Sequence, residues 1–119
     1  MTRRIRSFLG LQVLIFLLAA LTHFEVLFDG YPDREAGIAE SVIGGVLLAG
    51  LALTWIRPGW AARTTGILVQ GFALLGTFVG VTLLFVVGPR TTLDLVIHLV
   101  MVLVLIIGLV VTMRAPSRV

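Results

Sequence analysis

Residues 93–113 read LDLVIHLVMVLVLIIGLVVTM, an apolar run whose only ionisable side chains are Asp94 and His98. About 20 apolar residues are enough for a helix to cross the ~30 Å hydrocarbon layer of a bilayer. Three similar runs precede this one and cover Ser7–Phe28, Ala36–Trp55 and Ala61–Val87. The sequence therefore predicts an all-α integral membrane protein with four transmembrane helices, at about residues 7–28, 34–56, 61–87 and 92–113.

The four predicted helices use almost the whole chain of 119 residues, of which 59% are hydrophobic. We therefore expect a single domain over residues 1–119. The connecting segments are short, so consecutive helices should be antiparallel neighbours in a four-helix bundle. The first apolar run is longer than the ~7–15 residues of a signal peptide and lacks a small-x-small cleavage site, so a retained helix is expected. The absence of cysteine excludes disulfides and thiolate ligands.

Arginine supplies all nine basic residues, and most of them lie at the predicted membrane boundaries. One side of the membrane would carry seven of them: Arg3, Arg4, Arg6, Arg57, Arg63, Arg114 and Arg118. The other side would carry only Arg34 and Arg90, beside three carboxylates. The positive-inside rule then predicts that both termini are cytoplasmic (N-in/C-in), in the inner membrane of a bacterial cell. No basic helix with interleaved aromatic residues is present, so the expected partners are the lipid bilayer and other membrane subunits or further copies of the chain, not nucleic acid.

Local signals mark the starts of two helices. Asp33 follows Pro32 and is expected to cap the second helix. Thr91 and Asp94 have the spacing of a capping box at the start of the fourth helix.

Small and polar residues at three- and four-residue spacing are expected to line the helix interfaces, because lipid tails give no hydrophobic drive for helix association. The expected stripe in the second helix is Gly37, Ser41, Gly45 and Ala49. The stripe in the third helix is Gly66, Gln70, Ala73, Thr77 and Gly80, and the stripe in the first helix is Gln12, Ala19 and His23.

Threading the chain back and forth brings a group of ionisable residues near the outer membrane face. His23, Glu40 and His98 should lie about four to seven residues below the outer ends of their helices, which places them within one helical turn of each other. Asp94 and His98 are four residues apart and share a helix face, while Arg90 lies in the adjoining loop. Ionisable groups at such depth are costly unless they are partnered, so His23, Glu40, Asp94, His98 and Arg90 form the candidate ligand-binding site.

Three kinds of chemistry fit this set. A divalent metal could take His23, His98 and Glu40, with Asp94 as a further ligand or as the orienter of an imidazole. The two imidazoles could instead hold a haem iron axially, or a His and a carboxylate could exchange protons with a quinone in the outer leaflet. The alternative is that the groups only pair with one another and fix the helix register. Arg90 could anchor the interface, pair with a carboxylate or bind an anionic group.

Residues 39–51 read AESVIGGVLLAGL and resemble the second helix of DoxX-like membrane proteins. These are small bacterial four-span proteins with a Glu, a following Gly-Gly and a Leu-rich run that ends in Gly. The resemblance covers about residues 36–80. It implies a helical bundle with a polar site near Glu40 and an association with respiratory-chain or other redox complexes. The first helix departs from the family pattern, since residues 22–25 read THFE where the family has Gly…Lys.

Two other functions fit a four-span protein of this size. A purely structural accessory subunit would use its buried polar groups to organise a larger complex. A small proton-coupled transporter would need a carboxylate well inside the first helix, whereas Glu25 lies close to its predicted outer end. The sequence contains no hydrolytic or nucleotide-binding motif, so we do not expect the chain to be a stand-alone enzyme.

Overall fold

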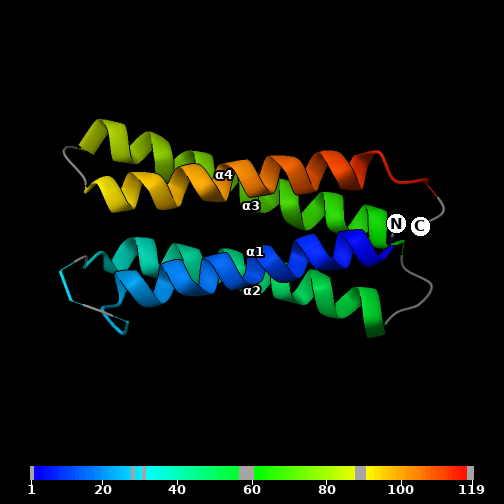
Figure 1. Cartoon of the computed structure of the whole chain (residues 1–119), viewed down its shortest axis with the longest axis horizontal. Helices are drawn as coiled ribbons and strands as arrows, with labels where there is room; N and C mark the ends of the chain where they lie inside the picture. Colours follow the sequence, from blue (N-terminus) through cyan, green and yellow to red (C-terminus); the bar gives the residue numbers. More distant parts are fainter. Residues whose placement is uncertain (1, 28, 31, 57–60, 88–90, 118–119) are drawn as a thin grey trace.

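The chain folds into four antiparallel helices in a computed structural model that describes residues 2–27, 29, 30, 32–56, 61–87 and 91–117 (Figure 1). The helices are α1 (Thr2–His23), α2 (Arg34–Ile56), α3 (Ala62–Val87) and α4 (Thr92–Met113). All four are long and apolar enough to span a membrane, and the molecule is 45 Å long. The all-helical architecture is therefore confirmed, with four helices that are each able to span a membrane. We call the end that holds the first and last described residues the termini end, and the opposite end the cluster end.

The helix bounds agree with the predicted bounds except in α1. The structure begins α1 at Thr2 and ends it at His23, five residues earlier at each end than predicted. The helix extends to Thr2 because Arg3, Arg4 and Arg6 are favourable helix residues that can reach past the apolar layer. It ends early because Glu25 has a φ of 57°, which is outside the right-handed helical range. In addition, the Asp33 amide donates a hydrogen bond to the His23 carbonyl over 3.1 Å, so the segment that follows α1 turns back toward its last residue. His23 is thus the last residue of α1, and not five residues inside it.

The interior of the bundle is unusually polar. Eleven polar or charged side chains are buried among the residues that the structure describes, and they lie beside aliphatic residues such as Leu9, Leu47 and Leu105. Large apolar side chains instead cover the outside; Leu75, for example, is 67% exposed. An apolar surface of this extent is typical of a protein that contacts lipid, where polar groups serve to hold the helices together.

The helix faces that pack inward match the prediction in α1 and α3 but not in α2. The predicted residues of α1 are buried, as are those of α3 apart from the half-buried Gly80. The buried face of α2 consists instead of Gly37, Glu40, Ile43, Leu47, Gly50 and Thr54. Ser41, Gly45 and Ala49 are exposed. The helix is rotated in this way because Glu40 is buried inside the bundle, which turns the stripe of small residues outward.

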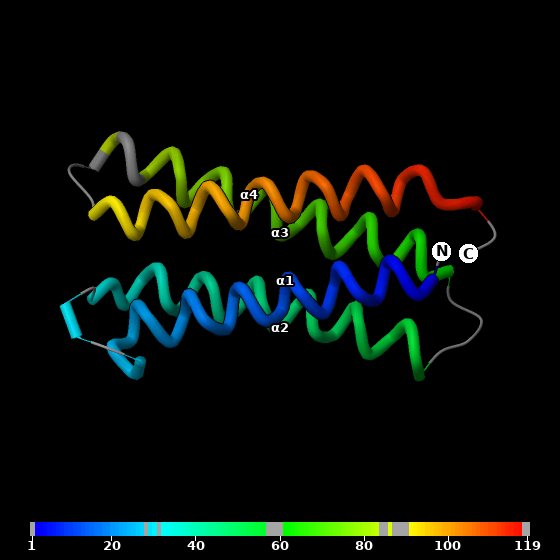
Figure 2. Tube along the Cα trace, in the orientation of Figure 1, coloured from blue at the N-terminus to red at the C-terminus, as the bar shows by residue number. Residues whose placement is uncertain are grey.

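The two helical hairpins, α1–α2 and α3–α4, lie side by side along the length of the bundle (Figure 2), and the starts of their second helices, α2 and α4, are 58 residues apart. The N-cap residues Asp33 and Thr91 correspond under this shift, and so do the starts of α2 and α4. The buried faces correspond as well: Glu40, Ile43, Leu47, Gly50 and Thr54 match His98, Met101, Leu105, Gly108 and Thr112. Gln12 and Gln70 are a further matching pair and are hydrogen-bonded to each other, Nε2 to Oε1, over 2.8 Å. The bundle therefore has an approximate twofold axis along its length, on which the two glutamines meet.

Candidate functional site

Three helices contribute ionisable side chains to one place at the cluster end. The side chain of Thr91 caps α4 by accepting a hydrogen bond from the Asp94 amide over 3.1 Å, which places Asp94 in the first turn. His98 follows one turn later. Asp33 caps α2 by accepting from the Ala36 amide over 3.1 Å, and Glu40 lies in the second turn of this helix. Both predicted caps are confirmed, and they fix the start of each helix that carries a carboxylate of the site.

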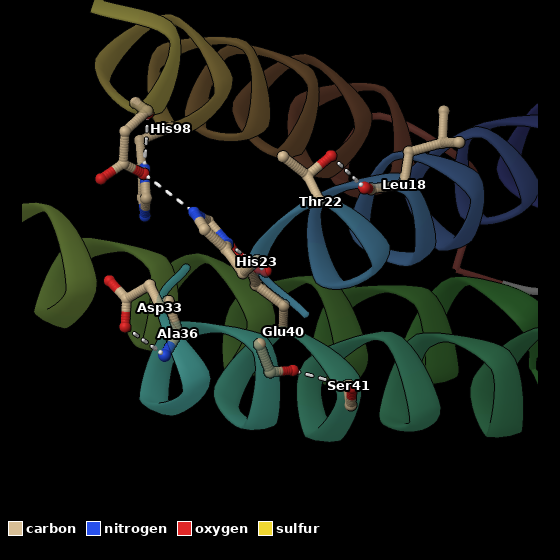
Figure 3. A network of polar contacts seen from close by, with 10 residues as sticks. Leu18, Thr22, His23, Asp33, Ala36, Glu40, Ser41 and His98 are labelled. Carbon is tan, nitrogen blue, oxygen red and sulfur yellow. Dashed lines mark hydrogen bonds and ion pairs between the residues drawn. The ribbon is translucent and has the colours of Figure 1, made fainter. Parts of the chain in front are cut away.

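The four side chains form one continuous line of contacts, in which His23 lies between Glu40 and His98 (Figure 3). His23 Nδ1 lies 2.8 Å from Glu40 Oε2, and its Nε2 lies 3.2 Å from Asp94 Oδ1. The same Asp94 oxygen lies 3.2 Å from His98 Nδ1, which also contacts the Asp94 carbonyl oxygen at 2.8 Å. We refer to Glu40, His23, Asp94 and His98 as the His–carboxylate cluster.

Burial makes these contacts obligatory. His23 and Glu40 are each 4% exposed, Asp94 is 9% and His98 8%. Charges removed from water at this depth need partners with good geometry. His23 can satisfy both of its carboxylates in two ways: as an imidazolium that donates from both nitrogens, or as a neutral ring that donates to one carboxylate and accepts from the other in its protonated form. These two states differ only in the position of a proton.

Each end of the cluster retains an unused polar atom. Within the described part of the chain, Glu40 Oε1 is buried and has no hydrogen-bond partner. At the other end, His98 Nε2 makes no hydrogen bond to a described residue and faces Gly80, where an added Cβ would lie 3.8 Å away. The members of the cluster therefore pair with one another, and one polar atom at each end of the cluster has no hydrogen-bond partner among the described residues.

A cavity of about 160 Å³ lies between α2, α3 and α4, next to the cluster. Glu40, Asp94 and His98 line its polar part, Met101 lines its apolar part, and Thr77 joins from α3. Asp33 and Glu35 also line it, at the start of α2. Since the start of α2 is at the cluster end, the cavity leads from His98 toward the end of the molecule and is bordered there by negative charge.

The structure brings together four of the five predicted site residues, namely His23, Glu40, Asp94 and His98. The fifth, Arg90, lies outside the described residues. Glu25 is exposed and accepts a hydrogen bond from the Gly30 amide at 3.0 Å. It therefore takes no part in the cluster, as its position in the sequence indicates.

The predicted metal ligands His23, His98 and Glu40 are not arranged as a ligand set. Among the described residues, no group of three or more His, Asp or Glu side chains is placed to hold a metal ion. Both ring nitrogens of His23 contact carboxylates, so neither points at a shared vacant position. Haem meets the same obstacle, and a cavity of about 160 Å³ is below the ~300–1,000 Å³ of sites that enclose drug-sized ligands.

Two features of the site were not predicted. Asp94 lies against both imidazoles, whereas the sequence predicts it as part of a capping box, as a metal ligand or as the orienter of one imidazole. Thr77 lines the cavity, and its place on the polar stripe of α3 was the signal that could have identified it. Comparison with family models, curated proteins and solved structures finds no match for this chain.

Proposed function

We propose that the His–carboxylate cluster exchanges protons with a quinone-type ligand dissolved in the membrane, and that the protein is a redox-associated subunit of the bacterial inner membrane. The observation that supports this proposal is the use of both ring nitrogens of His23. They join Glu40 to Asp94, and Asp94 in turn holds His98. The result is a line of titratable groups in contact, from Glu40 through His23 and Asp94 to His98, with an unused acceptor or donor at each end.

Proton exchange fits this geometry better than metal or haem ligation does. A metal bound by both histidines would need a ring nitrogen of His23, and both of these already contact carboxylates, whereas a proton can move along contacts that exist. Imidazole is the side chain whose ordinary titration range covers neutral pH. His98 Nδ1 donates a hydrogen bond to the Asp94 carbonyl oxygen, and the Asp94 carboxylate lies 3.2 Å from the same nitrogen. Nε2 is left to face the cavity, where an imidazole can exchange a proton.

The orientation belongs to the same proposal. Arg3, Arg4, Arg6, Arg63 and Arg114 are all at the termini end, so the positive-inside rule would put this end in the cytoplasm. The cavity beside His98 would then open toward the outer side of the membrane. An association with redox complexes, which the resemblance to DoxX-like proteins implies, agrees with a quinone-type ligand.

The pH dependence of ligand binding tests this function. Purified protein in mild detergent is titrated with a decyl-tailed benzoquinol between about pH 5 and 8, the range in which imidazoles ordinarily titrate. We expect the apparent Kd to change with pH, by about tenfold per pH unit where one proton is linked to binding. His23→Gln retains a hydrogen-bonding side chain but does not titrate, and it should flatten this dependence.

Glu25→Gln is the matched control, because it removes an exposed carboxylate near the same end without touching the cluster. It should leave both the Kd and its pH dependence unchanged. A wild-type protein that binds no quinol, together with cluster variants that only unfold more easily, would instead assign the cluster a structural role. Binding with the same pH dependence in wild type and His23→Gln would also contradict the proposal.

A further inference from the structure

A second cavity, of about 280 Å³, lies on the face formed by α1 and α2. Its lining is almost entirely apolar: Phe16, Leu17 and Ala20 from α1, and Gly44, Gly45 and Leu48 from α2. Leu17 is 52% and Leu48 53% exposed, so the cavity is a groove that opens on the apolar outer surface of the bundle. We call it the α1–α2 groove.

The groove passes over two adjacent glycines of α2, Gly44 and Gly45, which place no side chain in it. An added Cβ at Gly45 would meet nothing within 4 Å. At Gly44 it would lie 3.3 Å from Phe16 Cβ, so this glycine allows α1 to approach closely. The small residues that were expected to pack against other helices thus form a channel on the surface.

Glu40 is the polar residue at which the groove and the cluster meet, since it lines both the groove and the cavity beside His98. Its Oε2 is taken by His23, whereas its Oε1 has no partner within the described residues. A buried carboxylate oxygen without a donor is costly. A ligand that follows the groove toward Glu40 can supply that donor from a hydroxyl group.

We infer that the α1–α2 groove binds the apolar tail of a membrane-dissolved ligand whose hydroxyl head donates a hydrogen bond to Glu40. This inference rests on the proposed function for the choice of a quinol over another long-chain alcohol. The head then lies at the end of the cluster opposite His98. A quinol bound there is in contact with the lipid layer, while His98 faces the separate cavity at the end of the bundle. The reduced ligand should bind better than its quinone, because a quinone carries carbonyl acceptors and no hydroxyl donor.

Filling the groove tests its role. Gly45→Leu places a bulky side chain in open space without a backbone clash. Gly71→Leu is the matched control, because Gly71 is also a mid-helix glycine with nothing within 4 Å and lines neither cavity. With a decyl-tailed benzoquinol we expect Gly45→Leu to raise the Kd at least about tenfold, and Gly71→Leu to leave it unchanged. The corresponding decyl-tailed quinone should bind wild type about tenfold more weakly than the quinol, as expected for loss of a hydrogen bond to a charged group.

The outcomes separate this inference from the proposed function. If Gly45→Leu binds the decyl-tailed quinol as wild type does, the groove is not the tail site, even when His23→Gln still removes the pH dependence. If Gly45→Leu blocks binding while His23→Gln keeps the pH dependence, the groove is correct and the proton exchange is not. Equal affinity for quinol and quinone overturns the hydroxyl contact to Glu40. Binding of dodecanol as tight as that of the quinol identifies the ligand as a long-chain alcohol of the lipid phase.

Discussion

His23 and Gly108 show how single residues determine what the interior of this bundle can hold. His23 joins two carboxylates from different helices, so its removal would leave Glu40 buried without a donor among the described residues and Asp94 with His98 alone. Gly108 acts by having no side chain. Gln12, Gln70 and Thr112 meet beside it; the Gln70 amide donates to Thr112 Oγ1 over 2.8 Å and to the Gly66 carbonyl over 2.9 Å.

Gly108→Ala should therefore be strongly destabilising. An added Cβ would overlap Gln70 Oε1 and Gln12 Nε2, and it would lie 3.2 Å from Phe8 Cδ1. Overpacking and loss of the amide contacts together predict a loss of about 1–3 kcal/mol in the free energy of unfolding, measured by thermal or denaturant unfolding in detergent. Gly10→Ala is the control, since its Cβ would meet nothing within 4 Å; it should be neutral or slightly stabilising. Equal stabilities for the two variants would contradict this account.

At the scale of the helices, a cap positions the cluster at one end of the bundle and arginine contacts satisfy the helix ends at the other. Thr91 caps α4 and thereby places Asp94, while arginines from α1 and α3 contact the carboxyl ends of the following helices. Arg6 bonds both the side chain and the carbonyl of Thr54, and its guanidinium lies 3.7 Å above the ring of Trp55. Arg63 donates to the Met113 carbonyl over 3.2 Å. Donors at these positions satisfy carbonyls that a helix end leaves unpaired.

Thr91→Ala tests whether the cap also organises the site. Loss of the cap should cost about 1 kcal/mol of unfolding free energy and should disturb the contact of Asp94 with both imidazoles. The chain has two histidines, so ¹⁵N-histidine NMR follows each ring. We expect both sets of ring signals to shift in Thr91→Ala and to return in Thr91→Ser, which keeps the capping oxygen. Thr82→Ala removes an exposed hydroxyl that bonds only to its own helix and should leave the rings unchanged. A Thr91→Ala spectrum identical to wild type would separate the cap from the site.

The sequence was sufficient for the helices and their caps because these depend on local signals. Apolar run lengths determine the number of spans, and Asp33 and Thr91 mark two helix starts. The rotation of α2 could not be predicted in this way. The expected stripe, which contains Ser41, and the observed buried face, which contains Glu40, both have helical spacing. Burial of Glu40 against His23 decides between them, and that is a contact between helices. The end of α1 depends likewise on a contact, from the Asp33 amide back to the His23 carbonyl.

At the scale of the whole molecule, the two hairpins resemble each other, and the His–carboxylate cluster takes two residues from each of them. Glu40 and His98 occupy equivalent positions, so the approximate axis places a carboxylate opposite an imidazole. The cluster becomes asymmetric through His23 and Asp94, whose equivalents in the other hairpin are Val81 and Ala36. A repeat of this kind explains why the middle part of the bundle contains a matching pair of glutamines while the cluster end contains an acid–base chain.

The repeat predicts that the protein can be divided into two hairpins that reassemble. The helices of each hairpin pack against each other, and the contacts between the hairpins are those of α2 with α3, α1 with α4 and α1 with α3. We expect residues 1–58 and residues 59–119, coexpressed as separate chains, to copurify through a tag on one of them. The complex should show the same ¹⁵N signals of His23 and His98 as the intact chain.

The contacts between the two fragments include the Gln12–Gln70 bond. Gln12→Leu in the first fragment should therefore reduce copurification by about threefold or more, as loss of a buried hydrogen bond of ~0.6 kcal/mol or above predicts. Replacing the lipid-facing Leu14, which is 51% exposed, with Ala is the control and should leave copurification unchanged. Fragments that fold and purify independently of each other would show that the bundle is not held together by contacts between two equivalent halves.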